Sequence, residues 1–123
     1  MTLLAPIIAT AETFKTIRRD IHAHPELCYQ EHRTAQIVVD QLTKLGIEVH
    51  TGIGVTGVVG VIKGLTPGAG IALRADMDAL ALEEHNQFDH VSQYAGKMHA
   101  CGHDGHTATC LLYTSDAADD SDC

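Results

Sequence analysis

The sequence predicts an α/β fold in which helices pack on a mixed sheet. Two stretches with apolar residues at helical spacing are followed by three shorter candidate strands, two of them apolar. The order helix, helix, strand, strand, strand is typical of a layered α/β architecture. The chain has 123 residues, of which 45% are hydrophobic, so we expect one folded domain.

The first predicted helix opens near Pro6, because a proline costs no hydrogen bond at the first helical position. It ends at His24, since Pro25 pushes its predecessor out of the helical region. Its apolar stripe contains Ile7, Ile8, Ala11, Phe14, Ile17 and Ile21. The second predicted helix covers residues 31–45, and Gly46 is a suitable residue just beyond its end.

Short strands are predicted after the second helix. Residues 48–51 form one candidate, and the nearly continuous apolar residues 57–62 predict a buried strand. Residues 71–75 predict another buried strand that runs directly into Asp76. Residues 82–96 have no clear period and are expected to form a loop.

Charge and composition exclude some classes of function. The net charge of -8 argues against a nucleic-acid partner, because phosphate binding relies on a basic surface. There is no signal-peptide pattern and no apolar run of membrane-spanning length, so we expect a cytoplasmic protein without a membrane partner. The irregularly spaced cysteines are not a disulfide framework. They are Cys28, Cys101, Cys110 and Cys123.

A dense group of metal-binding residue types occupies residues 99–106, with the sequence His-Ala-Cys-Gly-His-Asp-Gly-His. Thiolate and imidazole are usual ligands of divalent transition metals. In extended backbone, residues two apart point the same way, so Cys101 and His103 can reach one metal ion. Asp104 is a plausible N-cap of a helix that reaches Leu112. The alternative is that several of the nine histidines share a polar loop by chance; a zinc finger fits poorly, since no second Cys or His pair follows.

Two further groups of polar residues have both a functional and a structural interpretation. Asp76 and Asp78 follow the predicted strand 71–75, and one carboxylate there could hold the ring of a ligand histidine. Alternatively, both are solvated acids at a strand end. His22 and His24 look like metal ligands, but a polar helix end packed on a neighbouring loop is the preferred interpretation.

Several segments together resemble the M20 family of metallopeptidases and amidohydrolases. The resemblance is closest to the branch with hippurate hydrolases, N-acyl-amino-acid amidohydrolases and auxin-conjugate hydrolases. The most specific match is the run Met-His-Ala-Cys-Gly-His-Asp-Gly-His of residues 98–106, supported by Arg-Ala-Asp-Met-Asp-Ala-Leu of residues 74–80. One departure is Ala81, where the family commonly has proline. The other matching runs are residues 18–27, 31–35 and 57–60.

The resemblance implies a two-metal centre that hydrolyses the amide bond of a small N-acyl amino acid, such as hippurate. Cys101 and His103 would be ligands of Mn, Zn, Co or Ni, and Asp78 would orient a ligand imidazole; Asp76 is a weaker candidate. The family's general-base glutamate, its remaining ligands and its small dimerisation domain, through which the parent would form homo-oligomers, have no counterpart in this chain.

Residues 1–112 are therefore expected to be the N-terminal part of a catalytic domain. We expect residues 113–123 to be a non-native or disordered acidic tail, because they hold four aspartates, no Lys or Arg, and break the apolar pattern. The chain itself is expected to be inactive, with unpaired strand edges and exposed apolar faces. The alternatives are a small structural metal-binding module and an inactive truncated product.

Overall fold

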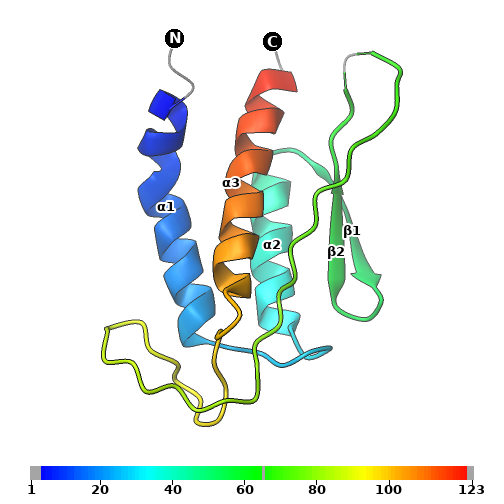
Figure 1. Cartoon of the computed structure of the whole chain (residues 1–123). Coiled ribbons are helices and arrows are strands. Elements are labelled where there is room, and N and C mark those ends of the chain that lie inside the picture. The colour runs from blue at the N-terminus through cyan, green and yellow to red at the C-terminus, as the bar shows by residue number, and fades with distance from the viewer. Residues whose placement is uncertain (1–3, 65, 122–123) are drawn as a thin grey trace.

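The computed structural model describes residues 4–64 and 66–121 of the chain (Figure 1). The elements, in order, are α1 (Leu4–Ala23), α2 (His32–Lys44), β1 (Glu48–Ile53), β2 (Gly57–Val61) and α3 (His103–Ser121). Helices and a sheet therefore coexist, and the predicted α/β class is confirmed.

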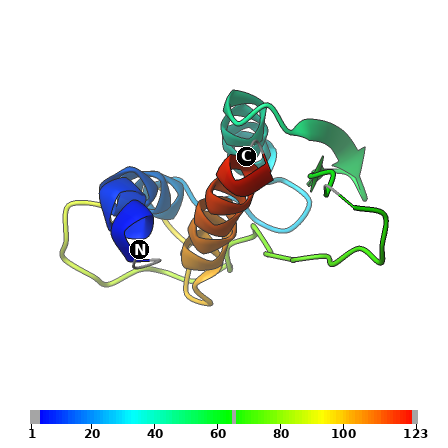
Figure 2. The same ribbon diagram turned by 90° about the horizontal axis from the view of Figure 1, so that it is seen from above.

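The three helices pack side by side, with α3 in contact with both α1 and α2. The two strands form an antiparallel hairpin on the side of α2 away from α1 (Figures 1 and 2). The long segment between β2 and α3 runs below the helices and returns to the start of α3. Sequence positions far apart thus meet at that end of the molecule.

Both predicted helices are confirmed to within two residues at each end. The first ends at Ala23, one residue before His24, and α2 ends at Lys44. Gly46 has a φ of 70°, a left-handed conformation that glycine adopts without steric cost. The predicted loop 82–96 is also confirmed, since it contains no helix or strand.

The predicted burial of the strands is wrong. Residues 57–61 do form β2, but Val59 is 44% exposed, because only α2 covers the hairpin. Residues 71–75 form no strand, and Ile71 is 92% exposed. A continuous apolar run is buried only where layers cover both its faces, and no described element covers residues 71–75. The exposed apolar face that the sequence analysis expects is therefore present at β2 and at residues 71–75.

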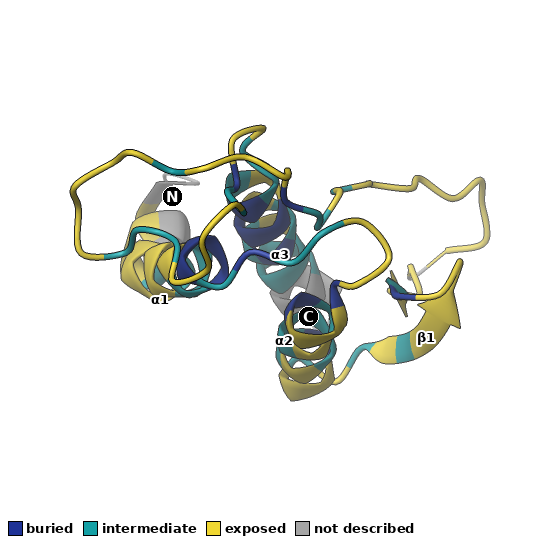
Figure 3. Cartoon of the chain, turned by 90° about the horizontal axis from the view of Figure 1, so that it is seen from below, coloured by how far each residue is buried: buried dark blue, intermediate teal, exposed yellow. Residues whose placement is uncertain are grey.

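The buried residues gather where α3 meets the end of α1, whereas β1 is largely exposed (Figure 3). The buried apolar side chains are Ile21, Ala23, Leu42, Ala79, Ala108 and Leu111. The core is small and lies beside the first turns of α3. No helix within the described residues is long and apolar enough to span a membrane.

Helix α3 extends beyond the predicted range 104–112. It begins at His103 and continues to Ser121, through most of the acidic residues 113–123. The assignment of that segment as a non-native or disordered tail stays a prediction.

Candidate metal centre

The cluster around Cys101 lies in a turn at the start of α3. Gly102 has a φ of 83°, in the left-handed region, and His103 is the first residue of the helix. The extended backbone predicted for this run is therefore wrong, because glycine lets the chain turn directly into the helix. Asp104 is not the N-cap, since it lies inside the first turn and its carboxylate contacts α1 instead.

The ring of His103 is held by Asp78. Its Nδ1 lies 2.9 Å from Oδ1 of Asp78 and 2.9 Å from the backbone oxygen of the same residue. Since both partners only accept, Nδ1 carries a proton, and in the neutral ring the lone pair is then on Nε2. The His103 side chain is only 15% exposed. A carboxylate that holds the imidazole in this way is common in metal sites, where the other ring nitrogen binds the ion.

Backbone hydrogen bonds place Asp78 close to α3. The next residue, Ala79, donates from its N–H to the carbonyl of Glu26 at 2.7 Å. Leu80 and Met98 exchange two hydrogen bonds, at 2.9 and 3.0 Å. The segment after Asp78 is thus tied by hydrogen bonds to the α1–α2 connection and to the residues that lead into α3.

Asp76 is oriented differently. Its Oδ1 accepts from Arg74 Nε at 2.9 Å, and the side chain is 46% exposed. Only its backbone oxygen reaches α3, where Thr107 Oγ1 donates to it at 3.2 Å. The structure therefore brings Asp78, but not the carboxylate of Asp76, into contact with His103.

Cys101 supplies an exposed free thiol. Thiolate and imidazole are suitable ligands of a transition metal, so these two residues fit such an ion in kind. In number they fall short: no group of three or more histidine, cysteine, aspartate or glutamate side chains within residues 4–64 and 66–121 is placed to hold a metal ion. The roles of Cys101 and His103 as ligands stay predictions.

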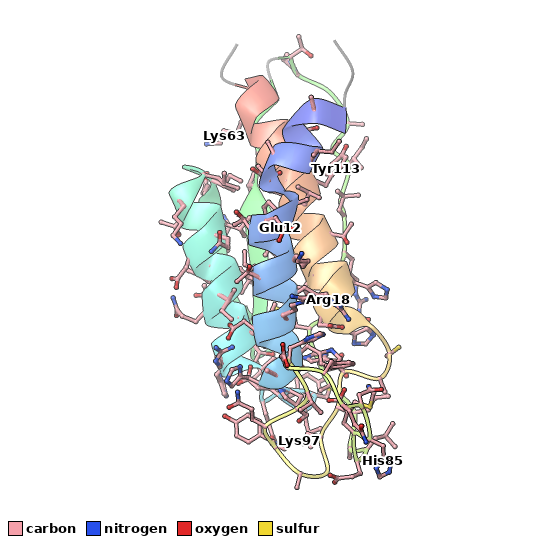
Figure 4. The ribbon with its side chains drawn as sticks, turned by 90° about the vertical axis from the view of Figure 1, so that its left-hand side faces the viewer. Glu12, Arg18, Lys63, His85, Lys97 and Tyr113 are labelled. Carbon is pink, nitrogen blue, oxygen red and sulfur yellow. The ribbon has the colours of Figure 1, made fainter. Side chains whose placement is uncertain are left out.

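A buried ionic network lies directly beside this turn. The Asp104 side chain is 1% exposed and accepts from Arg18 Nε at 3.0 Å and from His22 Nδ1 at 2.8 Å. The other ring nitrogen of His22 lies 3.0 Å from Oε1 of Glu84, in the long loop. Figure 4 places Arg18 between α1 and the first turns of α3. His22 packs on the neighbouring loop, as predicted, and does not face Cys101 or His103.

The carboxylates of this network are ionised more readily than usual. Burial by itself raises the pKa of Asp104, but hydrogen bonds from His22 and the Gly105 N–H, with the charges of His22 and Arg18, bring that pKa below its ordinary value. Burial also raises the pKa of Glu84, and donors of Asn86, His22 and Ser92 outweigh it in the same way. Sequence reasoning missed Glu84, since it lies in an aperiodic loop.

His99 is a further buried histidine next to this network. It is 4% exposed, and its ring lies 6.2 Å from that of His22. Neither ring nitrogen has a partner among the described residues. Burial therefore holds the pKa of His99 below its ordinary value, so the neutral form of the ring is favoured.

Known proteins resemble this chain closely over part of their length. It is 53% identical over 96 residues to thermostable carboxypeptidase 1 of Saccharolobus solfataricus, covering 77% of this chain and 24% of that protein. It is 46% identical over 112 residues to hippurate hydrolase of Campylobacter jejuni, covering 91% of this chain and 29% of that protein.

A solved structure gives the same result for the fold. The YxeP protein of Bacillus subtilis, described as a dinuclear metal-binding peptidase from the M20 family, superposes with a TM-score of 0.88 at 37% identity. The match covers 93% of this chain and 32% of that one. The sequence profile of peptidase family M20/M25/M40 matches residues 72–117, which include Asp78, Cys101 and His103. Residues 72–117 of the chain therefore match the M20 family, and the chain spans about a quarter to a third of the length of these relatives.

Proposed function

We propose that this chain supplies one wall of the metal centre of an amidohydrolase that cleaves the amide bond of an N-acyl amino acid. The observation that carries the proposal is the contact between Asp78 and the Nδ1 atom of His103, a residue that follows the exposed thiol of Cys101 by two positions. The similarity to a hippurate hydrolase supports the substrate class, and the similarity to a dinuclear peptidase supports the metal pair.

The proposed roles divide between two ligands and one supporting acid. Cys101, as the thiolate, and His103, through Nε2, would hold Mn, Zn, Co or Ni, while Asp78 keeps the imidazole in the binding tautomer. A pair of such ions supplies polarisation of the scissile carbonyl and activation of the attacking water. The remaining ligands and the general base must come from outside the residues that we assign here.

The ligand assignment is tested in a longer protein that contains this chain. Cys101→Ala should remove most of the bound metal and nearly all amidase activity, measured by elemental analysis and with hippurate as substrate. Cys110→Ala is the matched control, because Cys110 is another free cysteine, on α3, outside the proposed ligand set. Retention of both metal and activity by Cys101→Ala would rule the assignment out.

The chain of 123 residues should itself be inactive. Two donors cannot hold a two-metal centre, and the missing general base alone should cost about 10²–10⁴-fold in rate. The test is to add Mn or Zn to the purified chain and to assay hippurate and N-acetyl amino acids. Turnover close to that of an intact amidohydrolase would overturn this expectation. Tight binding of a single ion that is needed for folding would favour the structural metal-binding module instead.

A peptide is the second candidate substrate, since one relative is a carboxypeptidase at 53% identity. An N-acyl amino acid and the C-terminal end of a peptide share an amide bond next to a free carboxylate. Comparison of kcat/KM for hippurate and for short peptides, in the longer protein, separates the two. A higher value for hippurate supports the N-acyl amino acid.

A further inference from the structure

We propose that Asp104 is a positioning residue, which fixes the first turn of α3 and thereby keeps the His103 ring on Asp78. The inference rests on the proposed function in one respect only, namely that the His103 ring binds metal. Its structural part depends on the buried network between α1, α3 and the long loop.

The first step is the strength of the attachment. Oδ2 of Asp104 accepts two hydrogen bonds from cationic groups of α1, from Arg18 at 3.0 Å and from His22 at 2.8 Å. Both side chains of the pair formed by His22 and Asp104 are buried, with exposures of 5% and 1%. Hydrogen bonds to charged groups are about twice as strong as neutral ones, and burial protects them from water. Asp104 is therefore fixed to α1.

The second step is the charge balance around His22. Its two ring nitrogens face two carboxylates, and only the doubly protonated, positively charged ring donates to both. With Arg18, two cations then balance the carboxylates of Asp104 and Glu84. A buried pair that lacks one partner is strongly destabilised, so every member is needed to hold the others in place.

The third step is the position of His103 immediately before Asp104. Consecutive helical residues project about 100° apart, given roughly 3.6 residues per turn. Asp104 is anchored to α1, and His103 is anchored to Asp78 on a different segment. Rotation of the turn that releases one anchor also strains the other. The attachment of Asp104 thus fixes the direction in which His103 points.

The test uses Asp104→Asn, which keeps the size of the side chain and removes its charge. In the metal-free chain of 123 residues, ¹⁵N NMR of the imidazoles reports which nitrogen of His103 carries the proton. The original chain should show the Nδ1–H form alone, and Asp104→Asn should show both tautomers in a protein that is still helical by circular dichroism. The matched control is Asp40→Asn, an exposed aspartate of α2 whose carboxylate accepts from the Gln36 side chain, and it should leave the tautomer unchanged. A variant that merely lost stability would keep the single tautomer in its folded fraction.

Arg18→Gln is the second variant and is used if Asp104→Asn does not fold. It removes the half-exposed partner, whose side chain is 42% exposed, and keeps the His22 contact. A single Nδ1–H tautomer in every folded variant of the network would overturn the inference.

A cobalt titration separates the inference from the proposed function. In the longer protein, Asp104→Asn should weaken Co²⁺ binding by no more than Asp78→Asn does, because Asp104 acts on the ligand through the contact between His103 and Asp78. Absence of Co²⁺ binding in the unmodified protein would contradict the metal centre, whereas the tautomer measurement would still decide the role of Asp104.

Discussion

Asp78 and Asp76 are two residues apart, and the direction of each carboxylate decides what it can do. We predict that Asp78→Asn, in a longer protein that contains this chain, keeps much of the metal but lowers the rate by about 10–100-fold, because the His103 tautomer is no longer fixed. Metal content and kcat are the measurements, and Asp89→Asn, at an exposed loop position, is the control. Loss of metal with a normal rate per bound ion would mean that Asp78 is itself a ligand.

The sequence predicted the role of a single residue best where the residues next to it along the chain indicate that role. The position of Asp76 and Asp78 after an apolar run suggested one carboxylate near a ligand histidine, and the resemblance to the M20 family pointed to Asp78. The structure has the Oδ1 of Asp78 against His103. The partners Arg18 and His22 of Asp104 lie 86 and 82 positions away from it along the chain. No local pattern encodes such a contact, because it depends on how α1, the loop and α3 pack.

The start of α2 shows how one side chain organises a whole element. Glu31, at the N-cap position, makes no capping hydrogen bond. Glu26 performs that role from the preceding loop: Oε1 accepts from the Arg33 N–H at 2.9 Å, and Oε2 accepts from the Thr34 N–H at 2.8 Å and from its hydroxyl at 2.9 Å. Free N–H groups at a helix start need such partners.

We predict that Glu26→Gln lowers the free energy of unfolding by about 1.5–3 kcal/mol, because a charged acceptor is lost and an amide NH₂ faces a backbone N–H. The urea midpoint of the chain measures the change. Glu12→Gln is the control, since the Glu12 carboxylate pairs with the exposed Lys15 on the surface of α1, and the midpoint of this variant should not move measurably. An equal shift of the urea midpoint in Glu26→Gln and Glu12→Gln would show that the hydrogen bonds of Glu26 at the start of α2 add no more stability than a surface ion pair.

The helices were predictable and the burial of the strands was not, for a physical reason. Apolar spacing, Pro25 and Gly46 act within a few residues, so they determine the ends of α1 and α2 locally. An apolar strand needs neighbours on its edges and both faces, which only the tertiary structure supplies. Residues 71–75 have the composition of a buried strand but no such neighbour among the described residues.

For the whole molecule, the buried network should make the free energy of unfolding depend on pH. Burial opposes the ionisation of Glu84, but the donors of Asn86, His22 and Ser92 hold the pKa of Glu84 below the ordinary 4.5. The ionised Glu84 therefore stabilises the fold fully above about pH 4.5, and this stabilisation is lost as the pH falls through the lower pKa of the folded state. We predict that the urea midpoint decreases as the pH is lowered below about 4.5, and that Glu84→Gln makes this decrease smaller. The pH dependence that remains in Glu84→Gln should come from Asp104, since the pKa of Asp104 is also below its ordinary value. An unchanged pH profile in Glu84→Gln, relative to Asp89→Asn, would contradict the prediction.

The apolar surface of the hairpin side should determine how the isolated chain behaves in solution. Exposed apolar side chains gather on β2 and the segment after it, where Val59 is 44%, Ile71 92% and Leu73 56% exposed. The two-stranded sheet also leaves strand edges unpaired within the described residues. Apolar patches and free edges favour association, and each buried aliphatic side chain contributes about 1.5–3 kcal/mol.

We therefore predict that the chain of 123 residues self-associates with increasing concentration, as measured by sedimentation velocity. Ile71→Lys should weaken this association by roughly tenfold or more, because a charge replaces a side chain that would be buried between copies. Ile8→Lys is the matched control: Ile8 is 68% exposed, but it lies on α1, away from the hairpin. If both variants associate like the original chain, the hairpin side is not the contact surface. If Ile8→Lys alone dissociates the chain, the contact runs through α1, and the exposed residues 71–73 have no part in it.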